Sequence, residues 1–151
     1  MRAVCQRVTR ASVSVAGTQH ASIDRGLLVL LGVARADRHA EAERLAAKIA
    51  RLRVFDDEHG RFDRSLVDVA GSALVVSQFT LIADSGRQKG TRPDFSKAAP
   101  ADVAEPLYER FCDALRDLGV PVQRGVFGAR MAVELVNDGP VTIILDVEGR
   151  S

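Results

Sequence analysis

The stretch Asn137-Asp138-Gly139-Pro140-Val141-Thr142 lies between two apolar runs, residues 131–136 and 141–145, near the end of the chain. Both runs have the composition of β-strands, which predicts a turn between two paired strands. Gly-Pro is an unusual choice for that turn, because proline lacks a backbone N–H and disfavours helical conformations for the residue before it. Two interpretations stay open. One is an ordinary trans Gly-Pro loop, the default since only about 5–6% of X-Pro bonds are cis; the other is a rigid pair of exposed carbonyl groups that recognises a ligand.

Strand-like segments occupy most of the remaining sequence. Residues 2–16 alternate apolar and polar positions, with a change of phase that predicts a bulge or bend near 7–10. After a turn at 17–20, residues 23–33 predict a central strand, since 27–31 is apolar on both faces. Further strands are predicted at 54–55, 73–77, 122–126 and 131–147, and Phe62 and Leu66 are expected to pack beneath a loop.

Two segments have the apolar periodicity of helices. The first covers 37–53, with Asp37 as its N-cap. The second runs from about 100 to 118, with Pro106 in its first turn or so and Gly119 as its stop. Its buried stripe is predicted as Val103, Leu107, Phe111, Ala114 or Leu115, and Leu118. Strands and helices do not alternate regularly, so the predicted fold is a single α+β domain over 1–151. It is a mostly antiparallel curved sheet or open β-barrel of about six to eight strands with two outer helices.

The composition excludes several classes of protein. A chain that is 46% hydrophobic and 27% charged is not disordered, and a net charge of +1 argues against extended binding to duplex DNA. Cys5 and Cys112 lie in apolar runs and are expected to be buried free thiols, which fits a reducing cytoplasm. The N-terminus lacks a signal-peptide layout, and the longest apolar run, 27–33, is far below the ~18 residues of a membrane span. No membrane association is expected.

Several kinds of catalytic site are absent from the sequence. There is no GxSxG elbow, no phosphate-binding P-loop and no GxGxxG motif. His20, His39 and His59 are not spaced as metal ligands, and the acidic run 56–58 is interpreted as a solvated turn. No metal and no cofactor are expected.

The segment Ser77-Gln78-Phe79-Thr80-Leu81 follows a buried strand with hydroxyl and amide side chains. It is either a strand that ends in polar residues with Phe79 in the core, or a polar cradle made of Thr80 Oγ, the Gln78 amide and backbone N–H groups. No histidine base is apparent for Ser77 or Thr80, and a hydroxyl without a base is a poor nucleophile. A hydrolytic site here would therefore use positioned water and backbone donors.

These two stretches together resemble the two signature motifs of the D-aminoacyl-tRNA deacylase family (D-Tyr-tRNA deacylase type). The resemblance extends over nearly the whole chain and keeps the same order. It includes the flanking segments Gln6-Arg7-Val8, 26–33, Lys89-Gly90 with Arg92-Pro93 and Phe95, and Phe127-Gly128-Ala129-Arg130-Met131.

The resemblance implies a homodimeric enzyme that hydrolyses the ester between a D-amino acid and the 3′ end of tRNA, and that also clears glycine mischarged onto tRNA. In that family the Gly-Pro bond that corresponds to Gly139-Pro140 is cis and enters the active site of the partner subunit. A D-residue then points its side chain into open space, an L-residue collides with the Gly-Pro wall, and glycine has nothing to collide. Specificity would come from a steric clash, which discriminates more strongly than a lost apolar contact.

The resemblance also implies roles for individual residues. Ser77, Gln78, Phe79 and Thr80 would form the catalytic pocket, with Thr80 as a positioning group and the ribose 2′-hydroxyl assisting water. Asn137, Gly139, Pro140, Arg7, Phe127 and Met131 would bind substrate, with Arg7 orienting the Gly-Pro loop and the last two walling the adenine or ester region. Arg87, Lys89, Arg92 and Lys97 would contact phosphates of the tRNA acceptor end. Residues 85–88 form a loop about two residues longer than the usual form.

Two alternatives of other classes stay open. One is a non-catalytic nucleic-acid-binding protein of the same fold, of the DNA-unwinding-element type. The other is a small-molecule ester or amide hydrolase with Thr80 as its nucleophile.

Overall fold

The computed structural model describes residues 1–149. The main sheet contains β1 (Arg2–Val15), β2 (Thr18–Ile23), β3 (Gly26–Gly32), β6 (Ser72–Ser77), β7 (Val122–Arg124) and β8 (Ala132–Asp146), and a small second sheet contains β4 (Phe55–Asp56) and β5 (Phe62–Arg64). The helices are α1 (His39–Arg51), the 3₁₀-helix η1 (Phe79–Ile82) and α2 (Ala101–Asp117).

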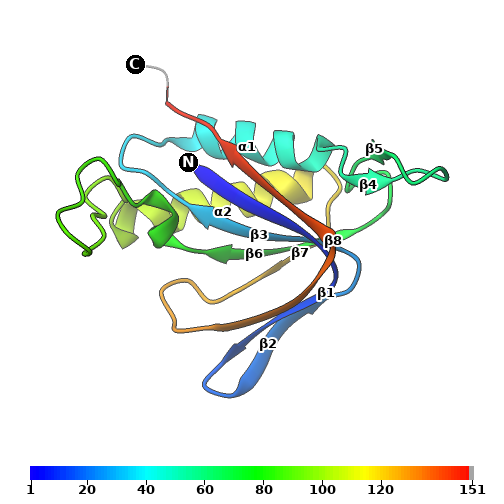
Figure 1. Ribbon diagram of the computed structural model, residues 1–151, viewed down its shortest axis with the longest axis horizontal. Helices are drawn as coiled ribbons and strands as arrows, with labels where there is room; N and C mark the ends of the chain where they lie inside the picture. Colours follow the sequence, from blue (N-terminus) through cyan, green and yellow to red (C-terminus); the bar gives the residue numbers. More distant parts are fainter. Residues whose placement is uncertain (150–151) are drawn as a thin grey trace.

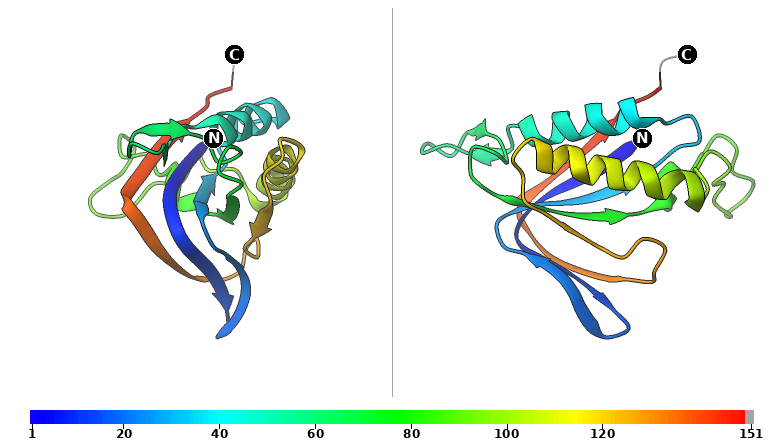
Figure 2. Two further views of the ribbon diagram at one scale, coloured as in Figure 1. Left: turned by 90° about the vertical axis from the view of Figure 1, so that its right-hand side faces the viewer. Right: turned by 180° about the vertical axis from the view of Figure 1, so that it is seen from behind.

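The main sheet curves into a half-open barrel with both α-helices on one side (Figures 1 and 2). The strand order is β2-β1-β3-β6-β7. β8 lies off this path and pairs with β1. β1 is antiparallel to β2, β3 and β8, whereas β3–β6 and β6–β7 are parallel because each pair is joined by a crossover that includes an α-helix. The predicted fold class, with two outer helices, is confirmed.

The core has two parts, one on each face of the sheet. Alternate residues of β6 point to opposite faces, so Ala73 and Val75 pack under the helices while Leu74 and Val76 pack inside the barrel. β3 divides in the same way, and Leu28 is buried on the barrel side. The prediction that this strand is central is therefore correct. Cys5 and Cys112 are free and buried, as predicted.

β8 is one strand where the sequence predicted two strands and a turn. Both apolar runs pair with β1 in the same antiparallel direction: Thr142 lies opposite Gln6 and Asn137 lies opposite Val8. Six positions of β8, 137–142, therefore face three of β1, 6–8, and residues 138–141 form a large bulge in β8. The register shifts again between Val8 and Arg10, which confirms the bend predicted in the first strand. The chain does not reverse, because one partner strand is long enough to pair with both runs.

The predicted strand at 23–33 is two elements. Residues 18–20, predicted as a turn, already belong to β2, and the turn lies at Ala16 and Gly17, which both have positive φ. β3 then begins at Gly26, where a Cβ would lie 1.8 Å from the Ser72 carbonyl oxygen. Only glycine allows β3 and β6 to approach so closely at this point.

The helix predictions need several corrections. α1 begins at His39 with Arg38 as N-cap, because the carboxylate of Asp37 is used elsewhere. Pro106 is the sixth residue of α2, in its second turn. In the buried stripe Val103 and Leu118 are exposed, and Ala104 takes the inward position one residue later. Leu66 is buried as predicted, but Phe62 is 54% exposed. None of the described helices combines the length and the apolar character that a membrane crossing requires.

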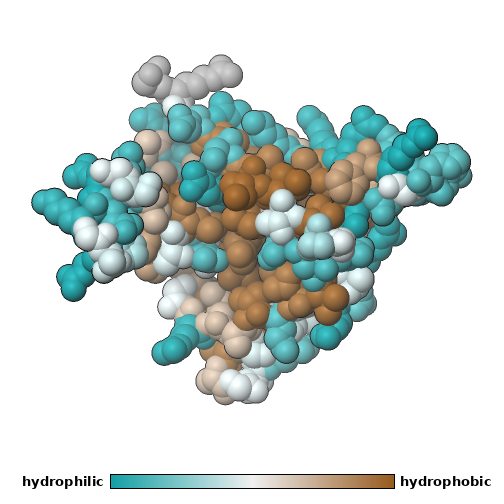
Figure 3. Space-filling view, in the orientation of Figure 1, coloured by the Kyte–Doolittle hydropathy of each residue, from teal (hydrophilic) through white to brown (hydrophobic). Residues whose placement is uncertain are grey.

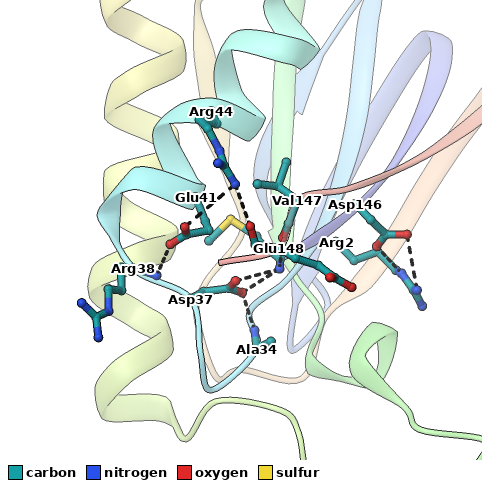
Figure 4. Close-up of polar contacts among 10 residues, drawn as sticks. Arg2, Ala34, Asp37, Arg38, Glu41, Arg44, Asp146, Val147 and Glu148 are labelled. Carbon is teal, nitrogen blue, oxygen red and sulfur yellow. Dashed lines mark hydrogen bonds and ion pairs between the residues drawn. The ribbon is translucent and has the colours of Figure 1, made fainter. Parts of the chain in front are cut away.

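A buried ion pair ties the first residue to the start of α1 (Figure 4). The α-amino group of Met1 lies 2.8 Å from Asp37 Oδ2 and donates a hydrogen bond to the Val147 carbonyl oxygen. Asp37 Oδ2 also accepts a local hydrogen bond from the Ala34 N–H. Both charged groups are almost fully enclosed. Removing one partner of such a pair leaves an uncompensated charge inside the protein.

Asp37→Ala is therefore expected to lower the free energy of unfolding by about 3–5 kcal/mol. The matched control is Asp146→Ala, which removes the partner of Arg2 in a half-exposed pair and should cost less than about 1 kcal/mol. Urea denaturation at neutral pH measures both. Equal costs for the two variants would show that the enclosed pair contributes no more than a surface one.

Candidate functional site

A pocket of about 410 Å³ opens at the C-terminal end of β6. Six of the residues proposed from the sequence share it: Ser77, Gln78, Phe79, Thr80, Phe127 and Met131. The sequence analysis missed the rest of its lining, which is Val33, Ala99, Ala101, Ala104, Gly128 and Ala129. The one available signal was the pair of alanines spaced three apart at the start of α2, where small side chains let the helix form a close wall.

The floor of the pocket is held by backbone pairing. The Gln78 N–H donates to the Leu31 carbonyl oxygen at 2.8 Å, which carries the β3–β6 pairing beyond the last strand residue. η1 then begins, and its first turn is closed by Leu81 N–H donating to the Gln78 carbonyl oxygen. The amides of Phe79 and Thr80 precede that bond, and within residues 1–149 neither donates a hydrogen bond. They are two adjacent free donors at the mouth of the pocket.

The side chains of the floor are polar but uncharged. The Gln78 amide nitrogen donates to Thr80 Oγ1 at 3.0 Å, so this hydroxyl receives a hydrogen bond from a group that cannot act as its base. Phe79 is 58% exposed, which contradicts the interpretation that places it in the core. No group of three or more potential metal ligands occurs among the described residues.

One wall of the pocket is formed by an aromatic side chain that packs against a buried tyrosine. The Phe127 ring lies 5.8 Å from the ring of Tyr108, whose hydroxyl donates to the Val75 carbonyl oxygen at 2.7 Å. Burial raises the pKa of Tyr108 and keeps it a neutral donor. The Met131 sulfur atom occupies space that Gly125 leaves free, since a Cβ at position 125 would lie 2.8 Å from it.

The Gly139–Pro140 segment forms the exposed tip of the β8 bulge, and its peptide bond is cis. Arg7 Nε donates to the Asp138 carbonyl oxygen at 3.0 Å, while Nη1 donates to the Val54 carbonyl oxygen and to Asp56 Oδ1. On the other side of the bulge, Asn137 Oδ1 accepts the Val141 N–H at 3.0 Å. The bulge is thus held at two points, by a side chain from β1 and by the side chain that precedes the bulge.

The bulge and the pocket do not meet within one chain. Arg7 pairs with Leu27, whereas Ser77 pairs with Leu31 at the other end of β3. Four residues of strand separate these levels by roughly 13 Å. The bend of β8 and the loop after η1 accordingly lie toward opposite ends of the sheet (Figures 1 and 2).

A basic loop, residues 84–97, leaves η1 beside the pocket. The Asp84 N–H donates to the Asp94 carbonyl oxygen and closes its base. Lys97 Nζ lies 3.0 Å from Asp84 Oδ2, so this cation is already paired. The other three basic side chains predicted to bind phosphate, Arg87, Lys89 and Arg92, are exposed on the loop.

Comparison with known proteins gives a consistent result over the full chain. The family described as D-Tyr-tRNA(Tyr) deacylase matches residues 4–146. A protein of Thermomicrobium roseum named D-aminoacyl-tRNA deacylase is 60% identical over 146 residues, which is 97% of this chain and 94% of that protein. One of the same name from Opitutus terrae is 56% identical and covers 99% of both chains.

Two solved structures share the fold. One is named c-Myc DNA Unwinding Element Binding Protein; it has a TM-score of 0.91 and 46% identity, and covers 99% of this chain and 100% of its own. The other is described as a probable eukaryotic D-amino acid tRNA deacylase, with a TM-score of 0.83 and 18% identity over 97% of this chain and 98% of its own. At that identity the second supports the fold alone.

The bulge geometry predicts a position-specific cost for adding a methyl group. Gly139 has φ +135°, and a Cβ there would lie 2.7 Å from Val141 Cγ2. Gly139→Ala should therefore lower the free energy of unfolding by about 2–4 kcal/mol. Gly17→Ala is the control, since Gly17 also has positive φ but no atom within 4 Å of its Cβ position, and it should cost about 1 kcal/mol. Thermal unfolding of the two variants measures the difference; equal costs would contradict the predicted clash.

Proposed function

Since this chain belongs to the D-aminoacyl-tRNA deacylase family of hydrolases, we propose that it hydrolyses the ester between a D-amino acid, or mischarged glycine, and the 3′ end of tRNA. The observation that carries the proposal is the pair of amides at Phe79 and Thr80, which have no acceptor within residues 1–149 and belong to residues lining a pocket whose side chains are all uncharged. Such a site suits a substrate that brings its own reactive ester and needs only to be positioned and polarised.

The ester carbonyl oxygen is proposed to accept hydrogen bonds from the amides of Phe79 and Thr80. Water attacks the carbonyl carbon, and the two donors stabilise the negative charge that develops on its oxygen. The bond between the carbonyl carbon and the ribose 3′-oxygen then breaks, and a proton of the water passes to the 3′-oxygen. The free D-amino acid and the tRNA leave. The neighbouring ribose 2′-hydroxyl assists the water, which replaces the side-chain base that the pocket lacks.

The remaining pocket walls are proposed to hold the terminal adenosine. Phe127 and Met131 supply flat and adaptable apolar surfaces, and the contact of Phe127 with Tyr108 fixes one of them. Thr80 acts as a positioning group. As a nucleophile it is disfavoured, because its oxygen accepts a hydrogen bond from Gln78 and no base contacts it within the described residues.

A second copy of the chain is proposed to complete the site with its Gly139–Pro140 bulge. Two observations support this arrangement. The bulge projects from β8 and is held by Arg7 and Asn137, yet it lies at the other end of the sheet from the pocket of its own chain. In addition, β8 carries exposed Val136 and Ile144, and apolar side chains gather over the middle of the face that β1 and β8 share (Figure 3).

The partner's bulge is proposed to select chirality by exclusion. Its carbonyl oxygens face the substrate α-amino group, and the rigid Gly139-Pro140 wall stands where an L-side chain would project. A D-side chain points away from the wall, and glycine has no side chain to collide. A wall fixed by buried Arg7 resists displacement, which is what a steric filter requires.

The tRNA is proposed to be gripped only near its acceptor end. Arg87, Lys89, Arg92 and Lys97 lie on the loop beside the pocket, and a net charge of +1 leaves no general attraction for a long duplex. The buried free thiols of Cys5 and Cys112 suit the reducing cytoplasm, where tRNA is charged.

The direct test compares a D-aminoacyl-tRNA with its L-counterpart at matched concentration. We expect the D-ester to be hydrolysed at least about 100-fold faster, because the clash acts on the L-side chain alone. Release of the amino acid over time is the measurement. Equal rates, or no turnover of either ester, would refute the proposal. The second outcome would favour a non-catalytic nucleic-acid-binding role, like the DNA binding for which the 46% identical structure is named.

Two substitutions separate positioning from covalent catalysis. Thr80→Ala is expected to keep kcat within about 10-fold of wild type, because the amide of residue 80 remains as a donor. Pro140→Ala is expected to reduce activity more than Thr80→Ala does. Its main effect should be a smaller ratio between the rates for the D- and L-esters. Single-turnover rates with both esters measure the two effects. Complete loss of hydrolysis in Thr80→Ala would instead support an acyl-enzyme formed on Thr80.

A further inference from the structure

Phe79 presents an exposed aromatic ring at the mouth of the pocket. More than half of this side chain is accessible, although phenylalanine usually packs inside a protein. The ring is also supported by a neighbour, since the Phe95 ring packs against it with centroids 5.2 Å apart and an interplanar angle of 78°. This T-shaped pair is a favourable geometry, and Phe79 is still 58% exposed beside it.

The loop that carries Phe95 uses its acidic groups internally. Asp84 accepts the Gly86 N–H and pairs with Lys97, and the carboxylate of Asp94 accepts hydrogen bonds from the amide and hydroxyl of Ser96. The Lys97 hydrogen bond lowers the pKa of Asp84, and the Ser96 hydroxyl lowers that of Asp94, so both stay ionised but occupied.

The three other basic side chains of the loop are oriented toward solvent. Arg87, Lys89 and Arg92 are all exposed, and the residues 89 and 92 pair across a narrow backbone bridge that places them on one tight turn. Within the described part of the chain none of the three makes an ion pair. The loop that packs Phe95 against the exposed Phe79 ring therefore also carries unpaired positive charge.

An exposed ring beside unpaired cations matches the chemistry of single-stranded nucleic acid. Bases stack on aromatic faces whatever their identity, and cations hold the backbone phosphates. A second copy of this chain would meet the ring equally well but would not need the cations. Charge complementarity thus favours a polynucleotide as the occupant of this surface.

We propose that Phe79 and Phe95 form a stacking platform for the unpaired nucleotides that precede the terminal adenosine, with Arg87, Lys89 and Arg92 holding their phosphates. The inference rests on the proposed function, because the terminal adenosine must occupy the adjacent pocket. Phe79 takes part in both regions. Its backbone amide donates to the ester carbonyl oxygen, and its ring stacks on the base of the preceding nucleotide. Phe95 packs against that ring, is not part of the pocket lining, and acts as a positioning residue.

If the platform binds the preceding nucleotides, the contribution of Phe95 to kcat/KM should depend on substrate length. Two substrates distinguish the platform from the pocket: full D-aminoacyl-tRNA reaches both, whereas D-aminoacyl-adenosine lacks the preceding nucleotides and reaches the pocket alone. Phe95→Leu should lower kcat/KM for the tRNA by about 5- to 100-fold, the range expected for losing one base–aromatic stack, and should leave kcat/KM for D-aminoacyl-adenosine within about 2-fold. Phe95→Tyr should restore activity on the tRNA, since it keeps an aromatic edge against Phe79.

Phe62→Leu is the control for changing an aromatic ring elsewhere, because the exposure of Phe62 is close to that of Phe79 but Phe62 lies on β5. It should leave the ratio of the two kcat/KM values unchanged. The inference is overturned if Phe95→Leu reduces both substrates equally, which would assign Phe95 to the pocket, or if it reduces neither. Failure of the wild-type protein to hydrolyse either D-ester would instead refute the proposed function, so the two failures are distinguishable.

Discussion

The requirement to satisfy one buried guanidinium shapes the end of the sheet that carries the Gly139–Pro140 bulge. Arg7 lies on the central strand β1, is only 7% exposed, and must find partners for its charge and its N–H groups. It finds them in the carbonyl oxygens of Asp138 and Val54 and in the carboxylate of Asp56. One side chain therefore joins the β8 bulge to the segment that follows α1. The shape of Gly139–Pro140 depends on this bond network as well as on its local sequence.

The pocket follows a different principle, since its lining carries no charged side chain and its free donors include backbone amides. The β3–β6 pairing ends at Gln78, and η1 begins before the amides of Phe79 and Thr80 have found partners. Backbone donors of this kind keep their position whatever the pH, and they tolerate substitution of the side chains they carry. Selectivity then has to come from shape. That is consistent with a rigid bulge and with walls built from alanine, phenylalanine and methionine.

Local pattern predicted much of the architecture. The apolar run at 27–31 indicated a strand buried on both faces, and the phase change near 7–10 indicated a bend; both are present. Four pocket residues belong to the motif at 77–81, and the family resemblance added Phe127 and Met131 from the segment 127–131; the structure brings all six together. The errors fall where a distant partner overrides the local signal. Asp37 does not cap α1 because the α-amino group of Met1 holds its carboxylate.

The sequence by itself determined the approximate places of both α-helices and of most strands, and which catalytic motifs it does not contain, because periodicity and residue type are local properties. It could not determine that Gly139–Pro140 is a bulge and not a turn, since that depends on both flanking runs finding the same strand, β1. Nor could it show that Phe79 is exposed to solvent and also lines the pocket. These features depend on pairing and packing between residues far apart in the chain, so only the tertiary structure decided them.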